Sequence, residues 1–192
     1  MVCPGEVPKQ LVGEARAPRP ARPGTPARYD HEYRREGVAN PLMISGPLLG
    51  WRHVEVADRR TTKDFAEVLR WVVEDLPPDA RRAVPVTDDP NVHDPGSLYE
   101  AFDPARARRI VERLEWHYTP GRGNWLSVAG CELAALPAQY LDRRIGSVAR
   151  LRQVVGAWAN ERNEREVGVD WRFTTADARV KLRRLYPAPQ KC

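Results

Sequence analysis

The sequence predicts an α/β domain in which a mixed sheet is flanked by helices. Short apolar stretches of strand length recur in the first two thirds of the chain, and longer stretches with apolar residues at helical spacing lie between and after them. The chain has 192 residues, 42% of them hydrophobic, which suits one sizeable core better than two. We therefore expect a single domain over residues 1–192.

Five stretches have the composition and the bounding turn residues of strands. They are residues 1–5, 38–44, 51–57, 83–87 and 116–119. The second and third are expected to pair through a tight connection that contains Gly46, Pro47 and Gly50. Pro41 and Pro85 weaken the strands that contain them, because each would remove a backbone donor from a central ladder.

The clearest helix is expected to begin at Thr62 as its N-cap and to end before Pro77 and Pro78. Its apolar residues recur at helical spacing from Phe65 to Leu76. Further helices are expected to begin at Asp94 and at Asp103, to span 124–140 and 147–158 with Asn124 and Ser147 as caps, and to span 175–186.

The charge and the cysteines limit the class of protein. The net charge of +5 and the pI near 9.4 favour an anionic partner without identifying one. Cys3, Cys131 and Cys192 form no CxxC pair and are odd in number, so we expect a reducing cytoplasm and no disulfide framework. No apolar run approaches the ~20 residues of a membrane span, and no signal peptide is recognisable, so no membrane partner is expected.

Residues 12–36 mix prolines and arginines without an apolar period. The prolines are Pro18, Pro20, Pro23 and Pro26, and the arginines are Arg16, Arg19, Arg22, Arg28, Arg34 and Arg35. This composition predicts an extended basic loop. The loop is either a solvated linker or a contact surface for nucleic acid or a second protein chain.

Asp88 and Asp89 follow the expected strand at 83–87. Hard divalent cations need carboxylate oxygens, and two such ions about 4 Å apart clamp the attacking and leaving oxygens in phosphoryl transfer. An acidic pair at a strand end of a basic protein is compatible with that chemistry on nucleic acid. Such pairs are more often solvated turn residues, so the pair alone does not establish a metal site.

Five separated segments carry a more specific signal. They are VGEARAP (12–18), GWRHVEVADRRTTKDFAEVL (50–69), VTDDPNVH (86–93), LEWHYTPGRGNWLSVAGCEL (114–133) and DWRFTTADARVKLRRLYP (170–187). In this order they resemble transposases of the insertion-sequence 630 family, relatives of the mariner elements. The resemblance implies a ribonuclease-H-like fold and a triad of Asp, Asp and Glu that holds two Mg²⁺ ions for DNA strand cleavage and strand transfer.

The resemblance places the second acid of the triad at Asp88, the expected catalytic residue and metal ligand, with Asn91 and His93 following in the same motif. His93 either supports the metal or a phosphate, or is an ordinary loop histidine. Gly5 occupies the position of the first acid, and Gly130 that of the third. One carboxylate of three cannot hold two Mg²⁺ ions at useful geometry, so we expect a poor metal site and loss of catalysis.

Three other acids could replace the missing ligands, which would make the protein a working nuclease. They are Glu6, Asp89 and Glu132. Glu6 is adjacent to Gly5 and should face the opposite side of its strand. Glu132 lies about 200° around the helix axis from Gly130, so it cannot substitute without a rebuilt helix start.

Two groups of cations are candidates for phosphate contact, although a solvated helix face explains them equally well. The first group is Arg179, Lys181, Arg183 and Arg184 on the last expected helix, and the second is Arg143, Arg144 and Arg150. We expect Trp171 and Phe173 to anchor the last helix to the core rather than to stack on bases. Cys131 is expected to be a buried small residue.

The resemblance also bears on partners. Family members precede this domain with helix-turn-helix modules that recognise the ends of the element, and we expect these modules to be absent here. We therefore expect an inactive transposase domain with mainly electrostatic affinity for DNA. The alternative is a non-catalytic DNA-binding or transposase-inhibiting module that self-associates, or pairs with intact copies, through residues 12–36.

Overall fold

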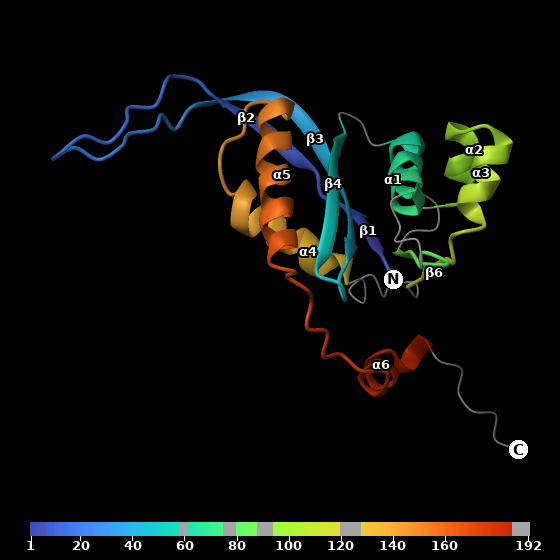
Figure 1. Ribbon diagram of the computed structural model, residues 1–192. Coiled ribbons are helices and arrows are strands. Elements are labelled where there is room, and N and C mark those ends of the chain that lie inside the picture. The colour runs from blue at the N-terminus through green and yellow to red at the C-terminus, as the bar shows by residue number, and fades with distance from the viewer. Residues whose placement is uncertain (58–60, 75–79, 88–93, 120–127, 186–192) are drawn as a thin grey trace, which may run out of the picture.

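The computed structural model describes residues 1–57, 61–74, 80–87, 94–119 and 128–185, and a sheet runs through its centre (Figure 1). The antiparallel strands are β1 (Cys3–Glu6), β2 (Lys9–Glu14), β3 (Tyr33–Gly46) and β4 (Trp51–Ala57). The parallel strands are β5 (Val86–Thr87) and β6 (His117–Tyr118). All the expected strands that fall in these residues are therefore present.

A parallel bridge between Val2 and Pro85 joins the two groups of strands. The Val2 N–H donates to the Val84 carbonyl at 2.8 Å, and the Val86 N–H donates to the Val2 carbonyl at 2.9 Å. The spatial order is thus β4-β3-β1-β5-β6, with β1 at the centre. The predicted mixed sheet is confirmed.

Helices cover both faces of the sheet (Figure 1). On one side lie α1 (Thr62–Glu74), α2 (Gly96–Ala101) and α3 (Pro104–Val111), and on the other lie α4 (Ala129–Leu136), η2 (Pro137–Leu141) and α5 (Val148–Glu164). Alternation along β3 serves both layers, because Leu42 and Ile44 pack toward α1 while Ala39 and Met43 pack toward α5.

The helix starts agree with the sequence apart from one cap. The Ser147 hydroxyl accepts from the Arg150 N–H at 3.2 Å, as predicted. Thr61 rather than Thr62 caps α1, because the Thr61 Oγ1 accepts from the Asp64 N–H at 3.2 Å and the Asp64 carboxylate accepts from the Thr61 N–H at 3.0 Å. The expected cap Asn124 lies outside the described residues.

Two expected helices are shorter than predicted. The stretch expected to be one helix at 124–140 is α4 followed by a π turn that begins at Pro137, whose ring nitrogen cannot donate to the preceding turn. The last expected helix is α6 (Thr175–Lys181) with a 3₁₀ turn, η3 (Arg183–Leu185). No helix among the described residues is long and apolar enough to cross a membrane.

The prediction of a loop over 12–36 is wrong, because this segment is a two-stranded ribbon that projects from the body (Figure 1). The ribbon begins as β2 paired with β3 and continues through bridges between Arg19 and Arg28 and between Arg22 and Thr25. Gly24 supplies the left-handed conformation at its tip, with φ of 75°. Proline and arginine give no alternating pattern, so the sequence hid a pairing that depends on the partner strand.

The two strand prolines have different consequences. The Pro41 carbonyl accepts from the Val7 N–H at 3.1 Å, so the missing Pro41 donor faces the gap between β1 and β2, where the ladder is already interrupted. The Pro85 carbonyl accepts from the His117 N–H at 2.9 Å, and its missing donor falls inside the β5–β6 ladder. The expected loss therefore holds for Pro85 alone.

The turn between β3 and β4 holds the chain that leaves α5. Gly50 has φ of 63°, and a Cβ there would lie 2.2 Å from the Glu166 carbonyl oxygen. The Val169 N–H donates to the Pro47 carbonyl at 3.0 Å. Only glycine fits this close approach of two backbones.

Gly50→Ala should destabilise the fold by at least about 1–3 kcal/mol, because the left-handed conformation is strained for alanine and its methyl group meets backbone. Gly156→Ala is the matched control, since a Cβ at Gly156 on α5 meets nothing within 4 Å. That change should stabilise the helix by up to about 1 kcal/mol. Chemical denaturation measures both, and a Gly50→Ala variant as stable as the parent contradicts the described turn.

Candidate functional site

Gly5 on the central strand β1 faces α4. A Cβ built at Gly5 would lie 2.6 Å from Leu133 Cδ1 and 3.4 Å from the Ala129 Cβ. Cys3 lies on the same face of the strand, and burial raises the pKa of its thiol to about 11, so it stays a neutral thiol. The space next to Gly5 is therefore filled by hydrocarbon from α4.

Gly130 lies in the first turn of α4, next to the residue that packs on Gly5. A Cβ at Gly130 meets nothing within 4 Å. Cys131 is exposed, so the expectation that it is buried is wrong. The two glycines that take the acid positions thus lie on adjacent elements, one against packed side chains and one in open space.

The remaining acid of the expected triad cannot be placed. Asp88 and Asp89, with Asn91 and His93, lie outside the described residues. Thr87, the last described residue before them, is fully buried at the end of β5. Since β5 is the neighbour of β1, the chain enters the acidic segment from the strand beside Gly5.

Glu6 lies on the opposite face of β1 from Gly5, as expected from strand alternation. It is paired in register with Leu42, which belongs to the core beneath α1. Among the described residues there is no group of three or more His, Cys, Asp or Glu side chains that could hold a metal ion.

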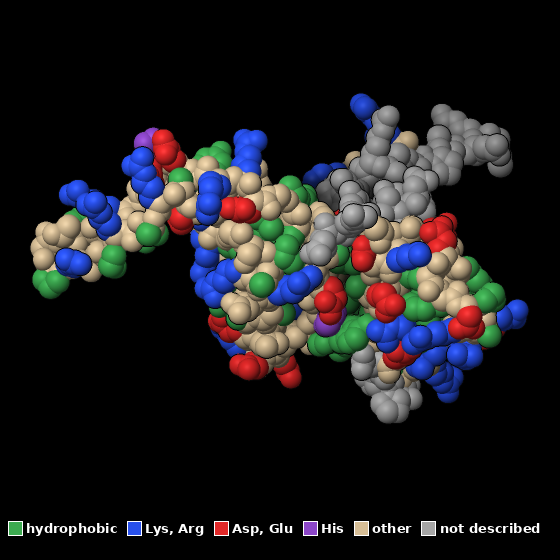
Figure 2. Space-filling view, turned by 90° about the horizontal axis from the view of Figure 1, so that it is seen from above, with side chains coloured by type: hydrophobic (Ala, Val, Ile, Leu, Met, Phe, Trp, Pro, Cys, Tyr) green, Lys and Arg blue, Asp and Glu red, His purple; other side chains and the backbone are tan. Residues whose placement is uncertain are grey.

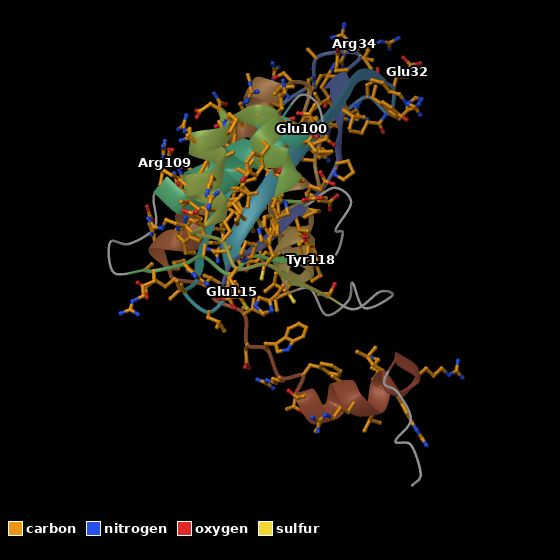
Figure 3. The ribbon with its side chains drawn as sticks, turned by 90° about the vertical axis from the view of Figure 1, so that its right-hand side faces the viewer. Glu32, Arg34, Glu100, Arg109, Glu115 and Tyr118 are labelled. Atoms are coloured by element: carbon orange, nitrogen blue, oxygen red, sulfur yellow. The ribbon has the colours of Figure 1, made fainter. Side chains whose placement is uncertain are left out.

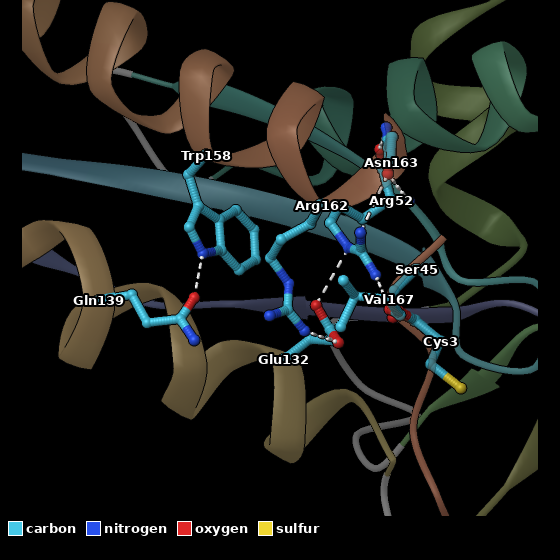
Figure 4. A network of polar contacts seen from close by, with 9 residues as sticks. All are labelled: Cys3, Ser45, Arg52, Glu132, Gln139, Trp158, Arg162, Asn163 and Val167. Carbon is cyan, nitrogen blue, oxygen red and sulfur yellow. Dashed lines mark hydrogen bonds and ion pairs between the residues drawn. The ribbon is translucent and has the colours of Figure 1, made fainter. Parts of the chain in front are cut away.

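Glu132 is buried in an ionic network that sequence reasoning missed (Figure 4). Its carboxylate lies 3.1 Å from Arg52 Nε and 2.8 Å from Arg162 Nη2. Burial lowers the pKa of the Arg52 guanidinium, and the Glu132 charge opposes that shift. Both carboxylate oxygens are therefore occupied by guanidinium groups, away from Gly5.

The two arginines are themselves held from several sides (Figure 4). Their guanidinium carbons lie 5.9 Å (Arg52) and 5.3 Å (Arg162) from the Trp158 ring centroid. The Asn163 amide accepts from the Arg52 backbone N–H at 2.9 Å and donates to the Arg52 carbonyl at 2.8 Å. Arg52 also donates to the carbonyl of Val167. This network joins β4, α4 and α5.

The C-terminal cations are carried by a helix that stands apart from the body (Figure 3). They are Arg179 and Lys181 on α6 and Arg183 and Arg184 on η3. No side chain of α6 is buried, and its start is fixed by a capping box between Thr174 and Asp177. These cations are thus brought together on one short segment.

The second basic group is partly used within the fold. Arg144 lies 2.6 Å from the Glu14 carboxylate and over the Tyr33 ring, 5.9 Å from its centroid. These contacts join the chain before α5 to the base of the ribbon. Arg143 lies over the ring of Tyr140, 5.7 Å from its centroid.

Comparison with known proteins decides the family. The sequence pattern of the DDE superfamily endonucleases matches residues 1–152 of the chain. The chain belongs to this family. No curated protein matches it.

The fold is similar to that of the Mos1 mariner paired-end complex with Mn, with a TM-score of 0.54 and 15% identity over 86% of this chain and 51% of that chain. A second structure, the Mos1 transposase paired-end complex with left transposon end, matches with a TM-score of 0.45 and 16% identity over 86% of this chain and 50% of that chain. This chain thus spans about half the length of the Mos1 chain. The expected ribonuclease-H-like fold is confirmed for this DDE endonuclease domain.

Glu132→Ala should lower the free energy of unfolding by about 3–5 kcal/mol, because it leaves two buried guanidinium groups without their counter-charge. Glu112→Ala removes an exposed helical ion pair with Arg108 and should change stability little. Urea denaturation of both variants measures the difference. Equal stabilities would show that the network does not hold α4.

Proposed function

We propose that this chain is the ribonuclease-H-like domain, over residues 1–192, of an insertion-sequence 630 transposase that binds DNA without cutting it. The observation that carries the proposal is at Gly5, where Leu133 Cδ1 fills the space that an acidic side chain would need. A DNA-acting role also fits the expected cytoplasmic location. The family match supports the ancestry, and the glycine positions support the loss of cleavage.

The donor set does not fit two Mg²⁺ ions. Hard cations need several protein oxygens, and neither Gly5 nor Gly130 offers a side-chain oxygen. Glu132 is neutralised by two arginines, and Glu6 lies on the other face of β1. Asp88 is the one remaining acid of the triad, with Asn91 and His93 beside it in sequence, and we derive no step that requires metal.

DNA is the proposed partner, held by the C-terminal cations. Arg179, Arg183 and Arg184 are exposed on a segment that stands clear of the body, so duplex phosphates can reach them (Figure 1). Contact of this kind is sequence-independent, which suits a domain considered without recognition modules.

A second candidate function is inhibition of an intact transposase through the ribbon. The ribbon extends well beyond the body and carries exposed arginines, as Figure 2 shows on its left side. Arg19, Arg22 and Arg28 lie on this projecting part, where a second chain can reach them. The ribbon therefore offers a contact surface without the metal site.

Restoring the acids tests the loss of cleavage. Gly5→Asp with Gly130→Glu and Leu133→Ala should bind Mg²⁺ or Mn²⁺ in calorimetry, since Leu133→Ala removes the side chain that a Cβ at Gly5 would meet. The parent chain should neither bind the metal nor nick supercoiled DNA. The matched control combines Gly5→Asn and Gly130→Gln with Leu133→Ala, which keeps the shape without the charge. Parent nicking that disappears in Asp88→Ala would overturn the proposal.

Two charge-reversal variants separate the DNA-binding and partner-binding functions. Arg179, Arg183 and Arg184 changed to Glu should weaken duplex binding and flatten its salt dependence by about 0.9 log units per lost phosphate contact. Arg19, Arg22 and Arg28 changed to Glu reverse the same number of charges on the ribbon and should leave duplex binding nearly unchanged. Light scattering with an intact relative shows whether the ribbon variant alone loses association. Duplex binding lost only in the ribbon variant would contradict the placement of the DNA contact.

A further inference from the structure

A pocket of about 350 Å³ lies between the body and the C-terminal segment. The body contributes Leu48 from the turn after β3 and Val86 from β5, and the C-terminal segment contributes Val169, Trp171, Phe173 and Ala178. The volume is that of a small-molecule site, which typically occupies about 300–1,000 Å³. The pocket is lined mainly by apolar and aromatic side chains.

The aromatic residues of this pocket do not bury themselves against the core, contrary to their expected anchoring role. Trp171 is 37% exposed, and its ring meets the edge of Phe173 with centroids 6.3 Å apart. Leu48 across the pocket is 72% exposed. The segment is attached upstream, where the Val169 N–H donates to Pro47, so the Trp171 ring is free to contact a ligand.

Positive charge surrounds these rings. Residues 170–185 contain five cations and two acids, and one of those acids, Asp170, is paired with Arg172 at 2.6 Å. Arg179 follows Ala178, a pocket residue, directly along α6. An aromatic platform with adjacent cations matches a nucleotide, which presents a flat base and an anionic phosphate, better than an apolar peptide or a lipid chain.

The pocket is also placed where a DNA strand would pass. Val86, one of its lining residues, precedes Asp88 by two positions at the end of β5. A strand that reaches the acidic segment from the C-terminal cations therefore runs past the Trp171 ring.

We propose that this pocket binds an unpaired nucleotide of a DNA strand, with the base stacked on Trp171 and the neighbouring phosphates held by the cations of α6 and η3. The inference rests on the proposed DNA binding and names the form of DNA that this site takes. Duplex DNA contacts the same cations through its phosphates, whereas only an unpaired base can enter the pocket.

Fluorescence anisotropy with labelled oligothymidylate, an abasic strand of equal length and a duplex tests this inference at low salt. Trp171→Ala should raise the Kd for oligothymidylate about tenfold and leave the Kd values for the abasic strand and the duplex unchanged. Trp171→Phe keeps a ring and should retain most of the affinity. Val180→Ala is the matched control, because Val180 is 80% exposed on α6 and does not line the pocket.

Several outcomes would overturn the inference. The parent chain may not discriminate oligothymidylate from the abasic strand, or Trp171→Ala may bind both as the parent does; either result removes the base-binding role while duplex binding leaves the proposed function standing. Absence of binding to all three probes removes the proposed function itself. A concentration-dependent dimer that Trp171→Ala abolishes assigns the pocket to a second copy of the chain instead.

Discussion

The buried charge of Glu132 is the constraint on which the candidate site depends. Removing a carboxylate from water costs several kcal/mol, so its position is fixed by the two arginines that compensate it. Because Arg52 lies on β4 and Arg162 on α5, the pair sets the rotation of α4 about its own axis. That rotation turns Ala129 and Leu133 toward β1 and leaves Gly130 facing open space.

The replacement of an acid by glycine has been accommodated by packing. With no side chain at Gly5, Leu133 occupies the adjacent space and adds hydrocarbon to the layer between β1 and α4. Catalytic competence and core packing now compete for the same volume. A single reversion to an acid would meet Leu133 before it met a metal.

Local patterns predicted the elements well where each element has its own periodicity. The strand pair around Gly50 and the helix capped by Ser147 have clear alternation or helical spacing, and both are present. The ribbon over 12–36 has neither pattern, because its pairing depends on which strand lies opposite rather than on side-chain alternation.

The site was less predictable than the fold. The partners of Glu132 are distant in sequence, and nothing in the helix itself indicates that Arg52 and Arg162 converge on it. The exposure of Cys131 follows from the same rotation of α4, which a sequence pattern cannot fix. Gly5 and Gly130 were placed by motif spacing, and the fold brings their elements together.

The side chain of Asn163 has a consequence for how the chain behaves among its own copies. No strand pairs with the outer edge of β4 among the described residues, and such an edge invites intermolecular strand addition. Asn163 imitates a missing strand by bonding both backbone groups of Arg52, and Arg152 donates to the Val56 carbonyl at 3.1 Å. Helix α5 therefore acts as a guard against aggregation, and fraying of its last turn would open the sheet to neighbouring molecules.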